Sequence, residues 1–138
     1  MDSRLNAPWV ALRFGIGLMA LLAGLDKFFN LLTDWAMYLS PAVAAVLPVS
    51  PSAAMAVVGG VEMCVGLAIL TGWTRYGALA ASVWLLAVAG NLALAGFLDV
   101  AVRDVVLSIA AFTLARLAPL GVRSVRPGAA DVRTPARA

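Results

Sequence analysis

Long apolar stretches, interrupted by short polar breaks, dominate this chain. Four of them approach the ~20 residues that a helix needs to cross a hydrocarbon core. They cover about residues 8–32, 52–71, 76–97 and 101–118. The connections 72–75 and 98–100 are short, so the helices that they join should be antiparallel neighbours. The pattern predicts an all-α fold, in which residues 1–120 form an integral membrane four-helix bundle.

The connection from Thr33 to Pro51 differs from the others, because its 19 residues exceed the usual helix–helix loop. It contains Trp35 and Tyr38, and such aromatic residues favour the lipid headgroup region. We predict an extracytoplasmic interfacial segment between helices one and two, with a short helix that begins at Thr33 or Asp34. Two interpretations stay open: a plain interfacial connection, or a lid over the outer mouth of the bundle.

Basic residues predict the orientation in the membrane. Arg4 precedes the first span, Arg75 separates the second from the third, and an arginine-rich tail follows the fourth. The other two connections carry Asp34 and Asp99 and no Lys or Arg. The positive-inside rule therefore places both termini in the cytoplasm of a multi-pass protein of the cell membrane. We expect residues 121–138 to be a flexible basic tail that contacts the membrane surface and not nucleic acid.

Composition supports a membrane environment and excludes some chemistry. Of the 138 residues, 63% are hydrophobic and 12% are charged, against about 25% charged residues in a typical soluble domain. The chain has one cysteine, Cys64, and no histidine. An intramolecular disulfide and the usual histidine-based metal sites are therefore excluded, and we expect no metal centre. We expect Cys64 to be a small buried residue.

Besides Asp26 and Arg116, five charged residues lie inside the apolar stretches. A charge in hydrocarbon costs about 2.5–3.5 kcal/mol on insertion scales, so it usually faces a partner, a cavity or a ligand. Helical spacing places two of them, Arg13 and Lys27, on one face of the first span with Gly17, Ala20 and Gly24. The five charged residues are Arg13, Lys27, Glu62, Arg103 and Asp104.

The second span carries a similar stripe of small residues around an acid. Met55, Gly59, Glu62, Gly66 and Ile69 share one of its faces. Small residues let helices approach closely, so we expect the two stripes to meet. Glu62 would then be neutralised by Arg13 or by Lys27, and the spacing does not choose between them.

Polar residues of the third and fourth spans extend this set. Arg103 lies near the outer end of its span, where it either faces inward or snorkels to the interface. The candidate intramembrane polar cluster or pocket is Arg13, Asp26, Lys27, Glu62, Asn91, Arg103 and Asp104, and the candidate lining residues are Gly24, Gly59, Gly66 and Trp84. One interpretation is an ion-pair network that fixes helix register. The other is a pocket that binds a ligand or relays protons, with the glycines making room for a ligand or for a close helix.

Several segments together resemble the DoxX family of small four-helix membrane proteins. They are ALRFGIGLMALLAGLDKF, GGVEMCVGLAILTGWTRYGAL and DVAVRDVVLSIAAFTLA, and the likeness covers about residues 10–117. It implies a bacterial or archaeal cytoplasmic membrane protein. Some relatives are subunits associated with quinone-linked oxidoreductases, including thiosulfate:quinone oxidoreductase. The family does not assign a reaction to the matching charged residues.

The resemblance makes an accessory membrane subunit of a quinone-linked redox system the first functional hypothesis. A quinone or a lipid headgroup would occupy the polar pocket, and the chain would be at most an oxidoreductase subunit. Its partners would be the lipid bilayer and a membrane or membrane-associated redox protein, with a homo-oligomer as a further state. Two alternatives stay open: a non-catalytic assembly or binding protein whose buried charges are structural, and a small-solute transporter.

Overall fold

The computed structural model describes residues 3–121, and the predicted tail lies almost wholly outside this range. The described part consists of helices and their connections and contains no strand, which confirms the all-α fold class. The elements in chain order are α1 (Ser3–Asp26), the 3-10 turn η1 (Trp35–Tyr38), α2 (Pro41–Val46), α3 (Pro51–Leu70), α4 (Thr74–Leu94) and α5 (Leu98–Gly121).

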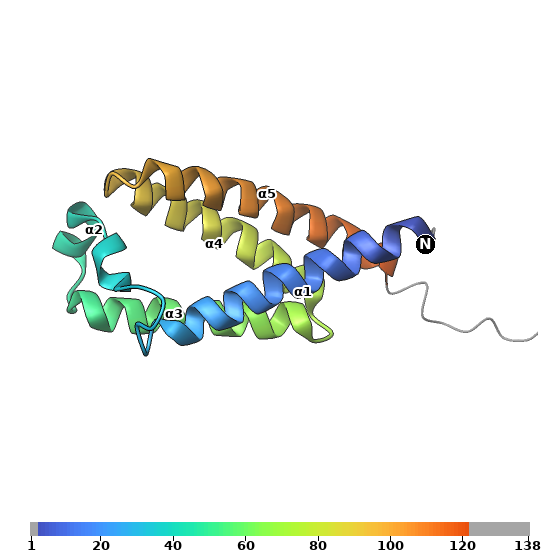
Figure 1. The fold of residues 1–138 in the computed structure, drawn as a ribbon, viewed down its shortest axis with the longest axis horizontal. Coiled ribbons are helices and arrows are strands. Elements are labelled where there is room, and N and C mark those ends of the chain that lie inside the picture. Colours follow the sequence, from blue (N-terminus) through green and yellow to red (C-terminus); the bar gives the residue numbers. More distant parts are fainter. Residues whose placement is uncertain (1–2, 122–138) are drawn as a thin grey trace, which may run out of the picture.

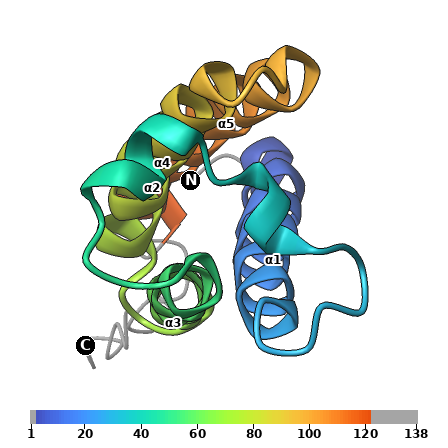
Figure 2. The same cartoon turned by 90° about the vertical axis from the view of Figure 1, so that its left-hand side faces the viewer.

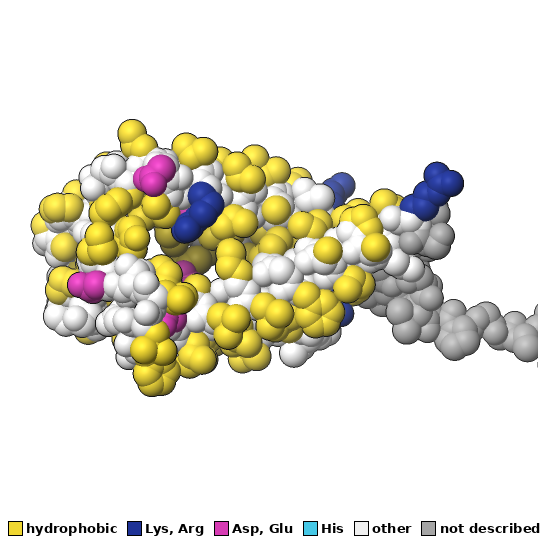
Figure 3. All heavy atoms as spheres, viewed as in Figure 1, with side chains coloured by type: hydrophobic (Ala, Val, Ile, Leu, Met, Phe, Trp, Pro, Cys, Tyr) yellow, Lys and Arg dark blue, Asp and Glu magenta, His cyan; other side chains and the backbone are white. Residues whose placement is uncertain are grey.

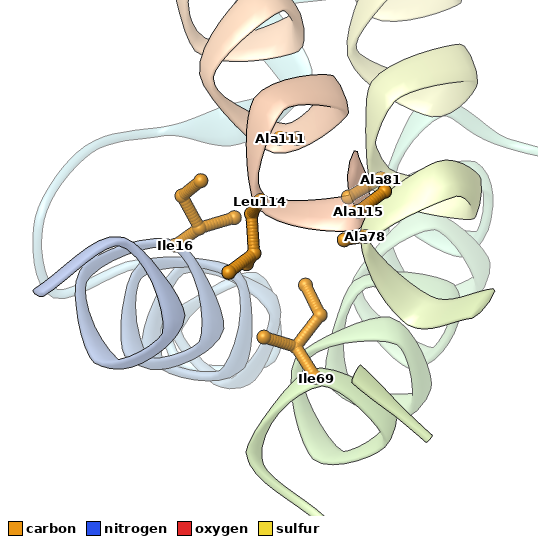
Figure 4. Packing of buried hydrophobic residues seen from close by; sticks show 7 residues of the cluster. All are labelled: Ile16, Ile69, Ala78, Ala81, Ala111, Leu114 and Ala115. Carbon is orange, nitrogen blue, oxygen red and sulfur yellow. The ribbon is translucent and has the colours of Figure 1, made fainter. Parts of the chain in front are cut away.

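The four long helices form two pairs that meet at one end and separate at the other. α1 packs along α3, and α4 packs along α5 (Figure 1). The pairs converge around Ile16 of α1, Ile69 of α3 and Leu114 of α5, whose side chains point toward one another (Figure 4). At the opposite end the pairs diverge, and η1 and α2 lie there (Figures 1 and 2).

Glycines bring α1 and α3 into backbone contact. A Cβ atom on Gly24 would lie 2.6 Å from the carbonyl oxygen of Gly59, and one on Gly59 would lie 2.5 Å from that of Gly24. A Cβ on Gly66 would lie 2.7 Å from the backbone nitrogen of Leu21. The predicted meeting of the two small-residue stripes is therefore confirmed.

Within the described residues, three helices are long and apolar enough to cross a membrane. They are Arg4–Asp26, Pro51–Leu70 and Thr74–Leu94. The helix α5 is not among them, because acidic and basic residues recur along it: Asp99, Arg103, Asp104 and Arg116. The structure thus supports a membrane protein with several spans, and the fourth span stays a prediction.

The predicted end of the first helix, at residue 32, is wrong. α1 ends at Asp26, and a turn follows in which Asn30 has a left-handed φ of 51°. The Asp26 carboxylate accepts hydrogen bonds from the backbone N–H groups of Leu31 and Leu32, at 3.0 and 3.1 Å. This side chain binds the backbone donors that follow the turn, although the apolar residues themselves continue to Leu32.

The segment between α1 and α3 contains the short helical turn that the sequence predicts. η1 begins after Asp34, whose carboxylate accepts a hydrogen bond from the N–H of Ala36. A second short helix, α2, was not predicted, although its signals are present. Ser40 caps it by accepting from Val43 N, and Pro41 occupies its first turn.

Candidate functional site

A cavity of about 810 Å³ lies between the two helix pairs. Its walls come from α1, α3, α4 and α5 and from the η1–α2 segment, and most of the lining side chains are apolar. Figure 3 shows the surface hollowed between α1 and α5, with basic and acidic side chains at the edge. The predicted polar residues that line it are Lys27, Glu62, Asn91, Arg103 and Asp104.

Lys27 and Glu62 form an ion pair in the cavity wall. Lys27 Nζ donates to Glu62 Oε2 at 2.6 Å, and only 6% and 15% of the two side chains are exposed. Lys27 lies in the turn directly after α1, and Glu62 lies in the middle of α3. Of the two basic partners that the sequence left open for Glu62, the structure selects Lys27.

Asp26 orients an aromatic ring over this pair. Its Oδ2 atom accepts a hydrogen bond from Trp35 Nε1 at 2.8 Å. The Trp35 ring then lies over Lys27, with Nζ 3.8 Å from the ring centroid, which is a cation–π contact. Asp26 is buried but does not line the cavity, so it acts on the site through Trp35.

Asn91 fixes the η1–α2 segment to α4. Its Nδ2 donates to the carbonyl oxygen of Tyr38 at 2.8 Å, and its Oδ1 accepts from the N–H of Ser40 at 2.9 Å. Ser40 is fully buried. Both polar atoms of the amide are therefore bonded to the backbone of the segment at the divergent end of the pairs.

Arg103 and Asp104 form a second charged pair at the cavity, on α5. Arg103 binds Asp104 Oδ1 through Nε at 3.1 Å and through one terminal nitrogen at 3.0 Å. The Asp104 side chain is 6% exposed, but that of Arg103 is 62% exposed. Arg103 therefore lies at the rim and Asp104 inside, which agrees with the outward alternative for Arg103.

Arg13 lies apart from the cavity. Its guanidinium donates to the carbonyl oxygens of Ile69, Leu70 and Thr71, at 3.0, 2.7 and 2.8 Å. These carbonyls end α3, where helices leave acceptors without partners inside the helix. Arg13 therefore caps α3 at the convergent end and does not join the predicted cluster.

A comparison with models of protein families shows to which family this chain belongs. The DoxX family model matches residues 9–102, which is more than half of the chain. The chain belongs to the DoxX family. Its matched region includes Lys27, Glu62 and Asn91 and ends immediately before Arg103. No curated protein and no solved structure matches this DoxX chain.

The predicted lining residues of the DoxX protein divide into two groups. Gly24, Gly59 and Gly66 lie in the contact between α1 and α3 and are not part of the cavity wall. The space that they leave beside Glu62 is thus taken by a neighbouring helix. Trp84 does line the cavity, and its Nε1 atom is buried with no hydrogen-bond partner among the described residues.

Two further expectations for the DoxX protein need correction. Trp35 was predicted only as an interfacial residue, but it lines the cavity and contacts Lys27. Its role depends on a hydrogen bond to Asp26 across the turn after α1, which hydropathy does not detect. Cys64 was expected to be buried, but it is exposed, because it lies on a face of α3 that no other described helix covers.

Proposed function

We propose that this DoxX protein is an accessory membrane subunit of a quinone-linked redox system. We further propose that its cavity holds the head of a quinone or the headgroup of another lipid. The observation that carries the proposal is the Lys27–Glu62 ion pair in the wall of a large apolar cavity. Ligand pockets typically measure about 300–1,000 Å³ and combine apolar walls with a few polar groups. An amphiphile with a compact polar head fits this combination.

The position of the hollow favours a ligand that comes from the bilayer. The hollow lies between α1 and α5, on the side of the helices (Figure 3). If α5 spans the membrane beside the three apolar helices, this side faces lipid tails. An isoprenoid or acyl tail would then leave the cavity between the two helices while the head stays near Lys27 and Glu62.

The charges of the cavity favour a neutral head over an anionic solute. Lys27 pairs with Glu62 and Arg103 with Asp104, so the charged residues in the wall balance. Arg13 is bonded to three backbone carbonyls at the other end of the molecule. The three basic residues therefore do not form a continuous series of steps for an anion, which supports the quinone proposal over the transport alternative.

The ion pair supplies both hydrogen-bonding functions that a quinone and its reduced form need. An ammonium group donates hydrogen bonds, and an ionised carboxylate accepts them. The Lys27 ammonium would donate to a quinone oxygen, and the Glu62 carboxylate would accept from a quinol hydroxyl. Electrons would come from the partner oxidoreductase, so this chain would hold the head and exchange its protons.

In the proposed orientation, the four long helices cross the cytoplasmic membrane. Both termini then lie in the cytoplasm. Arg4 and Arg75, which lie toward the convergent end, support it through the positive-inside rule. The cavity would then lie in the extracytoplasmic half. The η1–α2 segment would lie at the outer interface and cover the cavity, as the lid interpretation requires.

Quinone binding by variants that fill the cavity tests the proposal. Ala23 lines the cavity, whereas Ala11 lies on the exposed surface of the same helix. In lipid nanodiscs, we expect wild type and Ala11→Phe to bind a long-tailed menaquinone, and Ala23→Phe to bind it at least tenfold more weakly. Equal binding by Ala23→Phe, or no binding by folded wild type, would contradict the proposal.

A structural role for the buried charges is the second candidate. It is favoured by the complete pairing of Lys27 with Glu62 and by the capping of α3 by Arg13. Under this candidate the protein assembles with a partner and its cavity carries no specific ligand. The same nanodisc titration separates the two, because a scaffold would show no saturable quinone binding in any variant.

A further inference from the structure

The segment between α1 and α3 crosses from one helix pair to the other at the divergent end. Residues 27–50 leave α1, form η1 and α2, and return to α3 (Figure 2). On the way the segment is attached to α4, because the Asn91 amide donates to Tyr38 O and accepts from Ser40 N. The Tyr38 ring also packs on that of Phe97, in the α4–α5 connection, with centroids 4.8 Å apart. We call residues 27–50 the strap.

A buried core shared by the two helix pairs lies at the convergent end. Among the described residues, this cluster combines Ile16 of α1, Ile69 of α3 and Leu114 of α5. The second buried cluster lies at the divergent end and belongs to α4 and α5, and Tyr38 of the strap packs against it. Its residues are Ala89, Leu92 and Ala101. At this end the pairs face each other across the cavity, and the strap links them.

The strap is attached differently to the two pairs. It is covalently continuous with α1 and α3, and its Trp35 binds Asp26 and lies over Lys27. To the α4–α5 pair it is attached by the two hydrogen bonds of Asn91 and by the ring contact of Tyr38. A hydrogen bond between neutral groups contributes modestly to stability, so this attachment can open while the core at the other end stays packed.

We propose that Asn91 holds the strap closed, and that release of its two hydrogen bonds lets the α4–α5 pair move away from the α1–α3 pair. The shared core at the convergent end is the pivot of this motion. The opening between α1 and α5 then widens, and the head of the cavity ligand enters or leaves through it. The inference rests on the proposed function and deepens it, because it assigns exchange of the ligand to one attachment point.

The variant Asn91→Asp makes the attachment depend on pH. At about pH 8 an ionised carboxylate only accepts hydrogen bonds, so it cannot donate to Tyr38 O and the strap should be released. At about pH 4 a protonated carboxyl group, which burial favours over the charged form, has the donor and the acceptor that the amide uses. The strap should then be closed again. The wild type should be closed at both pH values.

Asn30→Asp is the matched control. Asn30 also belongs to the strap, but among the described residues it uses only its Oδ1 atom, which accepts from Trp35 N at 3.4 Å. A carboxylate accepts this hydrogen bond as well, so the variant should stay closed at both pH values.

Distances between nitroxide labels on the two pairs measure the opening. In lipid nanodiscs and without the native cysteine, one label pair replaces the exposed Leu22 and Val102, toward the divergent end. Another replaces the exposed Phe14 and Phe112, beside the core at the convergent end. In Asn91→Asp, we expect the first distance to lengthen by several ångström at high pH and to return at low pH. The second distance should stay constant.

The variant Asn91→Leu tests the attachment without a new charge. It removes both hydrogen bonds, so the first distance should be longer than in the wild type at both pH values. A wild-type distance in folded Asn91→Leu would contradict the role of Asn91.

Dissociation of a long-tailed menaquinone tests the link to the ligand. We expect it to leave Asn91→Asp several-fold faster at high pH than at low pH, with no such difference for the wild type or Asn30→Asp. If the wild type binds menaquinone but folded Asn91→Asp keeps the wild-type distance or dissociation rate at high pH, the role of Asn91 is contradicted and the proposed function stands. If the folded wild type binds no menaquinone, the proposed function and the exchange role are both contradicted, even where the labels move apart.

Discussion

At the scale of single residues, the Lys27–Glu62 pair is the centre of the account. The Lys27 side chain is buried and the Glu62 side chain is mostly buried, and they meet at 2.6 Å. Such a pair adds little net stability compared with apolar residues, but removal of one partner leaves an uncompensated buried charge. Removal of one residue alone should therefore destabilise the protein more than replacement of both.

A double-mutant cycle tests this dependence. Lys27→Met should lower the free energy of unfolding by about 3–5 kcal/mol, because Glu62 is left buried without its partner. Lys27→Met combined with Glu62→Gln should recover most of that loss, since neither residue of the pair then leaves an unpaired buried charge. Thermal unfolding in detergent measures the effect. Additive losses in the double variant would show that the two residues do not act as a pair.

The sequence predicted much of the polar site but not how its members are paired. Lys27, Glu62, Asn91, Arg103 and Asp104 were selected because charged and amide groups in an apolar stretch need partners. Both Arg13 and Lys27 share a face with Gly24, so spacing could not choose the partner of Glu62. That choice depends on where α3 ends, since its last carbonyls lie beside Arg13 and bind it.

At the scale of elements, the contact between α1 and α3 depends on glycines that face each other. Gly24 and Gly59 leave no room for a Cβ atom in either helix, because each faces a backbone carbonyl of the other. Backbone cannot rotate away as a flexible side chain can. The position of Lys27 relative to Glu62 therefore depends on these two residues.

Alanine substitutions on α3 test the contact. Gly59→Ala should destabilise the protein by about 1–3 kcal/mol, as overpacking does. Gly60→Ala is the matched control: a Cβ there meets nothing within 4 Å, so it should be neutral or slightly stabilising through helix propensity. Thermal unfolding of both variants in the same detergent measures the difference. Equal stabilities for the two would contradict the assigned role of Gly59.

The ends of the helices cannot be predicted from hydropathy alone. The apolar residues that end at Leu32 predicted a helix end six residues beyond that of α1, which ends at Asp26. The Asp26 side chain binds the N–H groups of Leu31 and Leu32, so this backbone is satisfied without a helix. Mean hydropathy does not include such hydrogen bonds from a side chain to the backbone. The small-residue stripes, in contrast, correctly predicted the α1–α3 contact.

At the scale of the whole molecule, the cavity results from the divergence of the two helix pairs. They meet around Ile16, Ile69 and Leu114 and separate toward η1 and α2. The stripes predicted which helix faces are close, but not the angle between the pairs. That angle depends on the sizes of side chains from four helices at once, which is why the cavity could not be predicted from the sequence.

Cysteine labelling tests the proposed orientation. In a Cys64→Ser background, Ala45→Cys reports on the η1–α2 segment and Gly72→Cys reports on the α3–α4 connection next to Arg75. A membrane-impermeant maleimide should label Ala45→Cys on intact cells, and Gly72→Cys only after permeabilisation, because basic connections remain in the cytoplasm. The reverse pattern would contradict the orientation and place the cavity in the cytoplasmic half.

Native mass spectrometry of the protein, extracted gently from its host membrane, tests the central claim most directly. The account predicts a one-to-one adduct with the mass of a quinone or another single lipid. The adduct should persist in Ala11→Phe and be lost in Ala23→Phe, whose side chain fills the cavity. A folded wild-type protein without an adduct, or an adduct of equal intensity in Ala23→Phe, would contradict the claim that this cavity holds a lipid headgroup.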